Sequence, residues 1–280
     1  MKFITLFLTC LIWLGLLPAW AATTIDVANV QELVAQIGSH RELRLAPGTY
    51  DLGGVAQPAA QTGSRIYNGG LLIYEVQDLT LVGSGAGQTK IISPFMESNV
   101  LTFTDCADIQ VKDLSVGHTV VPGGCQGDAV LVNDSRNLKF IRTDIYGCGQ
   151  YSLTLRFVDN ILVQDSKLHD CSYGLLDATI VHKGRFVNTQ FIHNGKLSAI
   201  NANHAVDLSF DGCRFFIDPD RKAYSYKQIP IKEYVAHYSL CSQARNVLEA
   251  SDRKLRFKHC EFSNVDPAEF GLLKSEGVTF

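Results

Sequence analysis

The feature that most constrains the fold of this chain is an internal repeat of about 23 residues. Each repeat contains two apolar residues five positions apart. The pairs are Val111 and Val116, Phe140 and Ile145, Val163 and Leu168, Phe186 and Phe191, Phe210 and Phe215, and Phe257 and Phe262. Apolar and polar residues alternate on both sides of a two-residue break. This pattern predicts two short strands joined by a corner, because a helix would repeat every 3.6 residues.

A third apolar segment follows the pair in four of the repeats, at 129–132, 152–155, 175–178 and 198–201. Three short strands in about 23 residues predict one turn of a solenoid. Each turn would stack about 4.8 Å from the next through parallel backbone pairing. Residues one period apart should therefore form ladders along the axis of the stack.

Two sets of small or sulfur-containing side chains follow the same period. Between the paired strands, a compact residue is expected to point inward in each turn: Thr143, Ser166, Thr189, Cys213 and Cys260. Cys125, Cys148 and Cys171 are 23 residues apart, which predicts a column of thiols. A metal or redox site is the alternative, but parallel stacking arranges thiols in a line, whereas zinc requires them around a point. We therefore expect a structural ladder, which leaves room for one disulfide between adjacent turns.

The first residues are typical of an export signal. Lys2 precedes an apolar run at 3–18, and Ala19-Trp20-Ala21 has the small-x-small pattern that signal peptidase cleaves. A membrane anchor is the alternative, but the run is short for a span. We expect 1–21 to be a signal peptide, 22–280 to form a single domain, and no later segment to span a membrane.

Both ends of a solenoid need caps, and one segment interrupts the repeat. Asn29 followed by Glu32 resembles a capping box at the start of a short amphipathic helix in VQELVAQIG at 30–38. Residues 217–252 break the rhythm, and we expect a helix over 233–250 carried on a long loop. The turns of Phe210 and Phe257 would then be neighbours. If the segment forms a further turn, these two turns are separated by it.

Composition excludes some classes of function. The chain has 280 residues, a formal net charge of −3, 46% hydrophobic residues and 19% charged residues. This composition is typical of a folded globular protein rather than a disordered one. No large basic field is available for nucleic acid, so we expect no nucleic-acid partner.

Several strings in the chain are similar to those of a known superfamily. They are LAPGTYDL, LTLVGSGAG, and the recurring NLKFIRTDIYGC and NILVQDSKLHDC. The chain resembles the right-handed parallel β-helix proteins of the pectate-lyase-like superfamily over roughly 25–275. The resemblance implies an all-β, right-handed parallel β-helix. It does not imply one activity, because the superfamily includes polysaccharide lyases, glycosidases, esterases, epimerases and members without known activity. The NTD, GHG, WIDH and DPHD motifs of its enzymes are absent from this sequence.

In proteins of this kind the substrate groove runs across the third strands and the turns after them. The residues expected there are Arg156, Asp159, Asp177 and His182 as catalytic candidates, and Arg136, Asn201, Asn203 and His204 as substrate-binding candidates, joined by Tyr224 and Tyr226 of the interrupting segment. A polyuronate lyase needs a base and a cation for the substrate carboxylate, roles that suit Asp177 and Arg156. A glycosidase needs two carboxylates, for which Asp159 and Asp177 are the candidates. Solvated surface charges are the alternative for each residue taken singly.

The sequence thus predicts an exported protein, periplasmic or secreted, that binds or processes an extended and acidic polysaccharide as a lyase or hydrolase. A non-catalytic envelope or glycan-binding module is the alternative. No metal or cofactor is expected, because the histidines lack the HxH and HExxH spacings of zinc sites. A calcium site would need six to eight oxygen ligands, and no such ligand set is evident.

Overall fold

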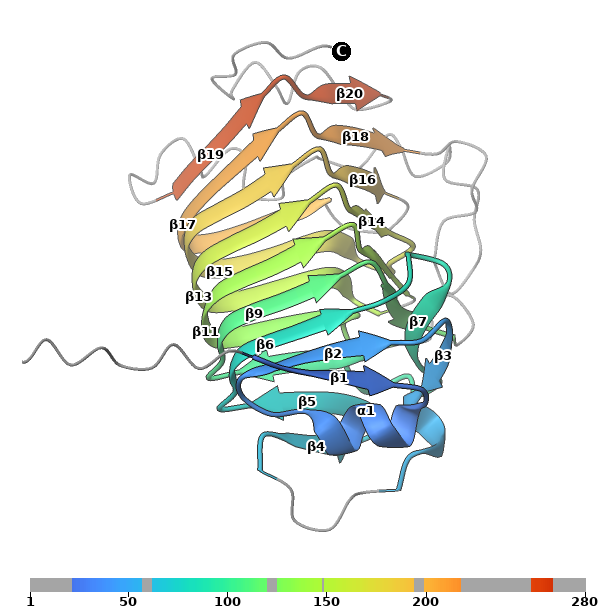
Figure 1. Ribbon diagram of the computed structural model, residues 1–280. Coiled ribbons are helices and arrows are strands. Elements are labelled where there is room, and N and C mark those ends of the chain that lie inside the picture. The colour runs from blue at the N-terminus through green and yellow to red at the C-terminus, as the bar shows by residue number, and fades with distance from the viewer. Residues whose placement is uncertain are drawn as a thin grey trace, which may run out of the picture.

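Turns of backbone stack on one another through strand pairing in the computed structural model (Figure 1). The structure describes residues 22–56, 62–119, 125–147, 149–193, 199–217 and 253–263. The stack runs from the N-terminal helix at one end to the last strand at the other (Figure 1). Among the described strands, all pairings are parallel except one, which gives the parallel β-helix that the repeat predicts.

The strands of each turn belong to two sheets, a large one and a small one. The large sheet contains, in pairing order, β1 (Thr23–Val27), β2 (Arg41–Leu45), β6 (Gln77–Val82), β9 (Ala107–Lys112), β11 (Val130–Ile141), β13 (Tyr151–Gln164), β15 (Gly174–Val187), β17 (Ile200–Asp211) and β19 (Arg253–Lys258), with β4 (Ser64–Tyr67), β5 (Gly70–Tyr74) and β8 (Leu101–Thr104) alongside. The small sheet contains β3 (Gly48–Asp51), β7 (Thr89–Ser93), β10 (Ser115–His118), β12 (Asp144–Tyr146), β14 (Lys167–His169), β16 (Gln190–His193), β18 (Arg214–Ile217) and β20 (Glu261–Ser263). The antiparallel pair is β4 with β5.

The apolar pairs of the repeat form the interior of the stack, as predicted. All twelve residues are buried and belong to one hydrophobic core. Phe210 aligns with Phe186 on one side and with Phe257 on the other. Its ring is stacked on both, with centroids 4.9 and 4.8 Å away. Parallel in-register pairing therefore places identical side chains directly above one another.

One detail of the predicted turn is wrong. The third strand does not end before the first strand of the next turn, because β11, β13, β15 and β17 each contain both. The backbone bends within these long strands at residues with positive φ, among them Asp134, Asn137, Asn160 and Lys183. Asp and Asn adopt this conformation more readily than most residues, so the chain turns here while the sheet continues on either side of the bend.

The interruption after residue 217 is a single insertion, as we expected. Strand β17 pairs directly with β19, and β18 pairs with β20. Cys213 and Cys260 therefore lie in adjacent turns, and the Glu261 amide donates to the Cys213 carbonyl at 2.9 Å. Residues 218–252, including the predicted helix over 233–250, lie outside the described residues.

The predicted N-terminal helix is α1 (Val30–Gln36), and η1 (Leu52–Gly54) is a single 3₁₀ turn. The Asn29 side chain accepts from the Glu32 amide at 2.9 Å, and the Ala28 amide donates to the Glu32 carboxylate at 2.8 Å. The bond to the Asn29 side chain is the one expected of a capping box, whereas the Glu32 carboxylate accepts from Ala28, one residue before the cap. Figure 1 places α1 across the open end of the first turns, and Leu33 and Val34 of the helix are buried in the core.

The compact residues between the paired strands point inward as predicted, and all five are buried. The Thr143 amide donates to the Ser166 hydroxyl at 3.0 Å, which links two adjacent turns. In the thiol column, Cys125 is disulfide-bonded and Cys171 is a buried free thiol. Cys148 lies outside the described residues. Within the described ranges no cluster of three or more ligating side chains could hold a metal ion.

Candidate functional site

The third-strand segments of β11, β13, β15 and β17 direct alternate side chains inward and outward. Leu153, Leu155, Leu176 and Ala178 are fully buried inside the stack, as predicted. Outward positions form two parallel columns in register. The columns are Thr154, Asp177 and Asn201, and Arg156, Thr179 and Asn203. The predicted groove residues on these strands therefore do lie on adjacent turns of one face.

A second polar column lies beyond the bend of the long strands. Arg136 aligns with Asp159, and Asp159 aligns with His182, as the period predicts. All three side chains are exposed. The register places Asp159 beside His182, five positions further along the strand than Asp177. The strand bends at Ile180, between Asp177 and His182, so the two columns lie on different stretches of β15.

The remaining predicted binding residues are a residue at a strand bend and residues that the structure describes in part or not at all. His204 is exposed and adopts a positive φ at the bend of β17. The backbone of Asn203 aligns with Thr179, but its side chain lies outside the described part of the chain. Tyr224 and Tyr226 fall in the undescribed range 218–252.

A carboxyl group that the sequence did not single out lies at the edge of this face. Asp128 precedes β11, and only 8% of its surface is exposed. Its Oδ1 accepts from the Tyr151 amide of the next turn at 3.0 Å, and its own amide donates to Asn99 Oδ1 at 2.8 Å. These bonds fix the carboxyl group of one turn against the backbone of the next. We call Asp128, Tyr151, Arg156, Asp177 and Asn201 the acid cluster.

Burial shifts the ionisation of three members of the acid cluster. Burial raises the pKa of Asp128 to about 6, and the negative charge of Asp177 adds to this rise, whereas Arg156 opposes it. Burial also raises the pKa of Asp177, although the hydrogen bond from Asn201 and the charge of Arg156 act against it. The pKa of Tyr151 is raised to about 12 by burial and by the two carboxylates.

The acid cluster combines groups that general acid–base chemistry uses. Asn201 Nδ2 donates to Asp177 Oδ1 at 2.6 Å, so one oxygen of Asp177 is held in place. Asp128, with a pKa about 6, can exchange a proton near neutral pH. Arg156 supplies a positive charge beside two carboxyl groups. Carboxyl groups with perturbed pKa values beside a cation are characteristic of functional sites, although structural networks also produce them.

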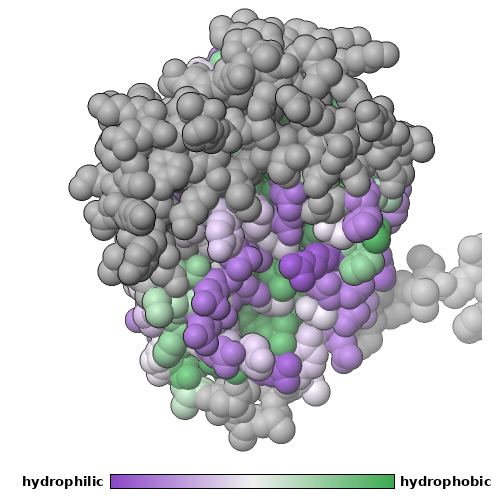
Figure 2. All heavy atoms as spheres, turned by 180° about the vertical axis from the view of Figure 1, so that it is seen from behind, coloured by the Kyte–Doolittle hydropathy of each residue, from purple (hydrophilic) through white to green (hydrophobic). Residues whose placement is uncertain are grey.

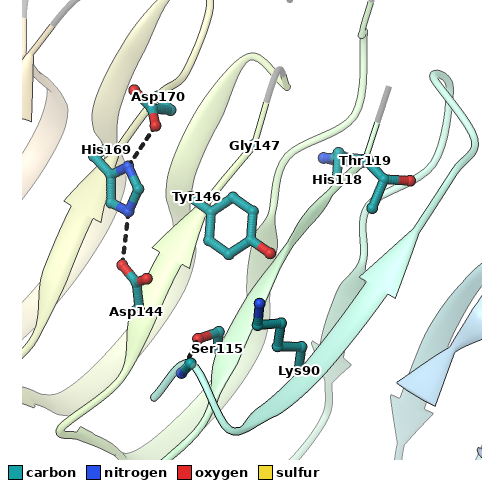
Figure 3. A pocket seen from close by; sticks show the side chains of 10 residues that line it. Lys90, Ser115, His118, Thr119, Asp144, Tyr146, Gly147, His169 and Asp170 are labelled. Atoms are coloured by element: carbon teal, nitrogen blue, oxygen red, sulfur yellow. Dashed lines mark hydrogen bonds and ion pairs between the residues drawn. The ribbon is translucent and has the colours of Figure 1, made fainter. Parts of the chain in front are cut away.

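A different set of side chains lines a cavity of about 390 Å³ on the outer face of the small sheet (Figure 3). The lining residues are Gly87, Lys90, Ser115, His118, Thr119, Asp144, Tyr146, Gly147, His169 and Asp170. Figure 3 shows His169 and the two aspartates on one side, His118 and Thr119 on the other, and Tyr146 between them. We call this the small-sheet cavity.

His169 is the centre of an ion-paired group in the small-sheet cavity. Its Nε2 lies 2.7 Å from Asp144 Oδ1, and its Nδ1 lies 2.7 Å from Asp170 Oδ2. Burial alone would lower the pKa of His169, but the hydrogen bonds to the two aspartates outweigh it and raise the pKa. Tyr146, one turn away in register, stacks on the imidazole with centroids 5.5 Å apart. Both nitrogens of His169 are therefore committed to carboxylates.

A second hollow, of about 560 Å³, continues along the corner between the sheets and shares Asp144 with the first. Residues at this corner adopt positive φ in successive turns: Asp113, Arg142, Asp165 and Asn188. Arg142 makes two hydrogen bonds to the carboxylate of Asp113, at 2.6 and 2.7 Å. Seen from behind, the described surface carries hydrophobic areas between hydrophilic ones (Figure 2).

Sequence reasoning did not find Asp128 or the small-sheet cavity. Asp128 lies in the loop that precedes β11, and no repeated spacing in the sequence singles it out. Tyr146 and His169 are 23 residues apart, so the period could have paired them. His118 and Lys90 come to line the same cavity only because β7 pairs with β10 in the folded protein.

Comparisons with known proteins rest on structure. No protein-family model matches the chain, and no curated protein matches its sequence. A chain described as Geobacillus virus E2 ORF18 has a TM-score of 0.56 at 11% identity, over 89% of this chain and 46% of that chain. This protein thus spans less than half the length of the viral chain.

Two polysaccharide-processing enzymes have similar folds. A pectin methylesterase in complex with a hexasaccharide has a TM-score of 0.53 at 11% identity, over 84% of this chain and 75% of that chain. The pectate lyase of Paenibacillus sp. 0602 has a TM-score of 0.50 at 8% identity, over 86% of this chain and 71% of that chain. Identities this low establish the fold alone. With the strand order and register described above, they show that the chain has the right-handed parallel β-helix fold of the pectate-lyase-like proteins.

Proposed function

We propose that this protein is exported and processes an extended, acidic polysaccharide by acid–base chemistry at the acid cluster. The observation that carries the proposal is the group formed by Asp128, Asp177 and Arg156. Two carboxyl groups with raised pKa values lie beside one guanidinium on the face where adjacent turns align. The solved pectin methylesterase and pectate lyase with this fold support a carbohydrate partner.

The residues divide the chemistry between them. Arg156 would neutralise the carboxylate of a uronate unit. Asp128, with its pKa about 6, would transfer a proton to or from the sugar, and Asp177, oriented by Asn201, would be the second carboxyl group. Tyr151 stays protonated because its pKa is about 12, so its phenol would donate a hydrogen bond to the sugar. Elimination and hydrolysis both use such a set.

A non-catalytic glycan-binding module is the second candidate, and one observation favours it. Asp128 and Asp177 are exposed by only 8% and 9%, which limits the direct access of a polymer to them. In that case the exposed column of Arg136, Asp159 and His182 would contact the glycan. Charged side chains of this kind bind through hydrogen bonds and ion pairs without turnover.

An assay on a panel of polyuronates separates these functions. The purified protein is incubated with each polymer, and both unsaturated ends, by ultraviolet absorbance, and new reducing ends are measured. Elimination produces both signals and hydrolysis produces only the second. We expect Asp128→Asn, Asp177→Asn and Arg156→Met each to reduce turnover about 100-fold or more, because each removes a proton-transfer or charge-stabilising group.

The control is Asp134→Asn, which removes an exposed carboxylate at a positive φ that Asn also tolerates. It should retain full turnover. Glycan binding without either product would favour the binding module. Turnover that survives Asp128→Asn and Asp177→Asn would refute the acid cluster as the reacting site.

A further inference from the structure

The small-sheet cavity contains a buried hydrogen-bonding atom that has no partner. His118 is 95% buried, since 5% of its surface is exposed, and its Nε2 lies 2.7 Å from the Ser98 carbonyl oxygen. Its Nδ1 is buried and makes no hydrogen bond among the described residues. A buried polar atom left without a partner is costly, so such an atom indicates a group that completes the site.

The contact with Ser98 determines what kind of partner His118 needs. A carbonyl oxygen only accepts hydrogen bonds, so Nε2 must carry the proton. Burial lowers the pKa of His118, which favours the neutral ring. Nδ1 of a neutral ring protonated at Nε2 has a lone pair and no hydrogen. The missing partner must therefore donate a hydrogen bond, as a hydroxyl group does.

The backbone that faces His118 Nδ1 belongs to a glycine, which has no side chain to fill this position. A Cβ at Gly147 would lie 2.9 Å from His118 Nδ1, which is closer than side chains normally pack. Gly147 also has a φ of 151°, a conformation that other residues rarely adopt. Glycine at this position thus avoids a side-chain carbon that would crowd Nδ1, and both residues line the small-sheet cavity.

The other groups in the cavity are polar and of both kinds. Lys90 and His169 are the basic groups, and Asp144 and Asp170 are the acidic groups. Figure 3 shows Lys90 extending from β7 toward the hydroxyl edge of Tyr146. The Tyr146 ring is not a free stacking platform, because it packs on His169 and directly against Gly117. Recognition here would depend on hydrogen bonds.

We propose that the small-sheet cavity binds one neutral, hydroxyl-rich sugar ring, one of whose hydroxyl groups donates to His118 Nδ1. Lys90 donates to a ring or hydroxyl oxygen, and Asp144 and Asp170 accept from further hydroxyls. The cavity volume of about 390 Å³ lies within the usual range for small-molecule sites. The two aspartates in the lining favour a neutral ring over the carboxylate of a uronate. This site is on a different sheet face from the acid cluster and does not depend on turnover there.

Nitrogen NMR of the histidine side chains in the full-length protein tests this site directly. Without ligand, His118 should show a protonated Nε2 and an unprotonated Nδ1. Neutral methyl hexopyranosides are then titrated as probes, with galacturonate and glucuronate for comparison. We expect at least one neutral glycoside to shift the Nδ1 resonance saturably, because a hydrogen bond donated to that atom changes its shielding.

Paired variants separate binding in the cavity from binding elsewhere. Lys90→Met should weaken the saturable shift at least tenfold, whereas Lys139→Met, which changes an exposed lysine of β11, should leave it unchanged. A reversed His118 tautomer, an Nδ1 resonance that no neutral glycoside moves, or tighter binding of uronates would each overturn the proposal. Water alone would then occupy the space. A protein without polyuronate turnover should still show the shift of the His118 Nδ1 resonance, so failure of the proposed function and failure of this site can be told apart.

Discussion

Asp128 shows how one residue gains a functional property from its position rather than from its identity. Its carboxyl group sits between two turns, where it bonds to the Tyr151 amide and loses contact with water. Burial then raises its pKa to about 6 from the usual 3.8. Exposed carboxylates elsewhere on the solenoid surface are not held in this way. Burial alone thus brings the pKa of a common surface residue close to neutral pH.

The raised pKa of Asp128 makes stability depend on pH in a definite direction. The folded protein holds this proton more tightly than the unfolded chain, so stability falls as pH rises from about 4 to 6. Above pH 6 the folded protein carries the full cost of the ionised, buried carboxylate, which is about 3 kcal/mol for a shift of this size. Asp128→Asn removes the charge. Between pH 4 and pH 7 we expect the free energy of unfolding of the variant, relative to the wild type, to rise by up to about 3 kcal/mol, measured by urea unfolding.

Asp134→Asn is the matched control for this measurement, because its carboxylate is exposed. Its stability relative to the wild type should not change over the same pH range. A constant difference between Asp128→Asn and the wild type at every pH would mean that the carboxyl group of Asp128 is not perturbed by burial.

At the scale of the element, the strands are held by ladders of identical rings. Phe186, Phe210 and Phe257 stack along one column, with interplanar angles of 15° and 9°. Phe191, Phe215 and Phe262 form the column beside it, at 14° and 8°. The two columns contact one another edge-on, for example Phe210 with Phe215 at 5.6 Å. The middle rings, Phe210 and Phe215, therefore contact rings in their own turn and in both neighbouring turns.

Removing one ring from the middle of the ladder should be costly. Phe210 is fully buried, so Phe210→Ala leaves a cavity and removes contacts to three turns. We expect a loss of about 3–5 kcal/mol in the free energy of unfolding, measured with urea. Phe157→Ala is the control, because Phe157 is 51% exposed at a strand bend, and it should change stability by less than about 0.5 kcal/mol. Similar losses for both variants would contradict the importance of the ladder.

At the scale of the whole molecule, a stack of turns has ends that could pair with other copies. Strand β1 pairs only with β2 among the described strands, so one of its edges is open. The helix α1 lies across this end and buries Leu33 and Val34 against the first turns (Figure 1). An uncovered end would offer both apolar side chains and strand edges to another molecule.

Disrupting the cap should therefore cause self-association. Leu33→Asp places a charge in a fully buried position of α1, which should release the helix from the core. We expect concentration-dependent oligomers by size-exclusion chromatography with light scattering. Gln31→Asp, on the exposed side of the same helix, should behave like the wild type. Leu33→Asp protein with the same mass as the wild type at every concentration would contradict the capping role of α1.

Also at this scale, export remains an expectation from the sequence, because residues 1–21 lie outside the described residues. In the part of the chain that the structure describes, no helix is long and apolar enough to cross a membrane. The disulfide at Cys125 fits an oxidising compartment, where such bonds persist.

The amino-acid sequence by itself determined the fold, the register and the N-terminal cap. A solenoid repeats the same local environment in each turn, so apolar residues recur in the sequence with a period of about 23. The columns Arg136, Asp159, His182 and Thr154, Asp177, Asn201 follow from that period alone. Their catalytic and binding roles remain predictions.

Only the tertiary structure decided which polar groups lose water and which groups face one another. Asp128 lies in a loop before β11, and the small-sheet cavity combines in-register strand residues with Gly87, Thr119, Gly147 and Asp170 from the turns between strands. The pKa of Asp128 and the unpartnered Nδ1 of His118 depend on burial by residues far away in the sequence. Periodic patterns encode stacking, whereas burial and charge balance depend on three-dimensional neighbours that no local spacing specifies.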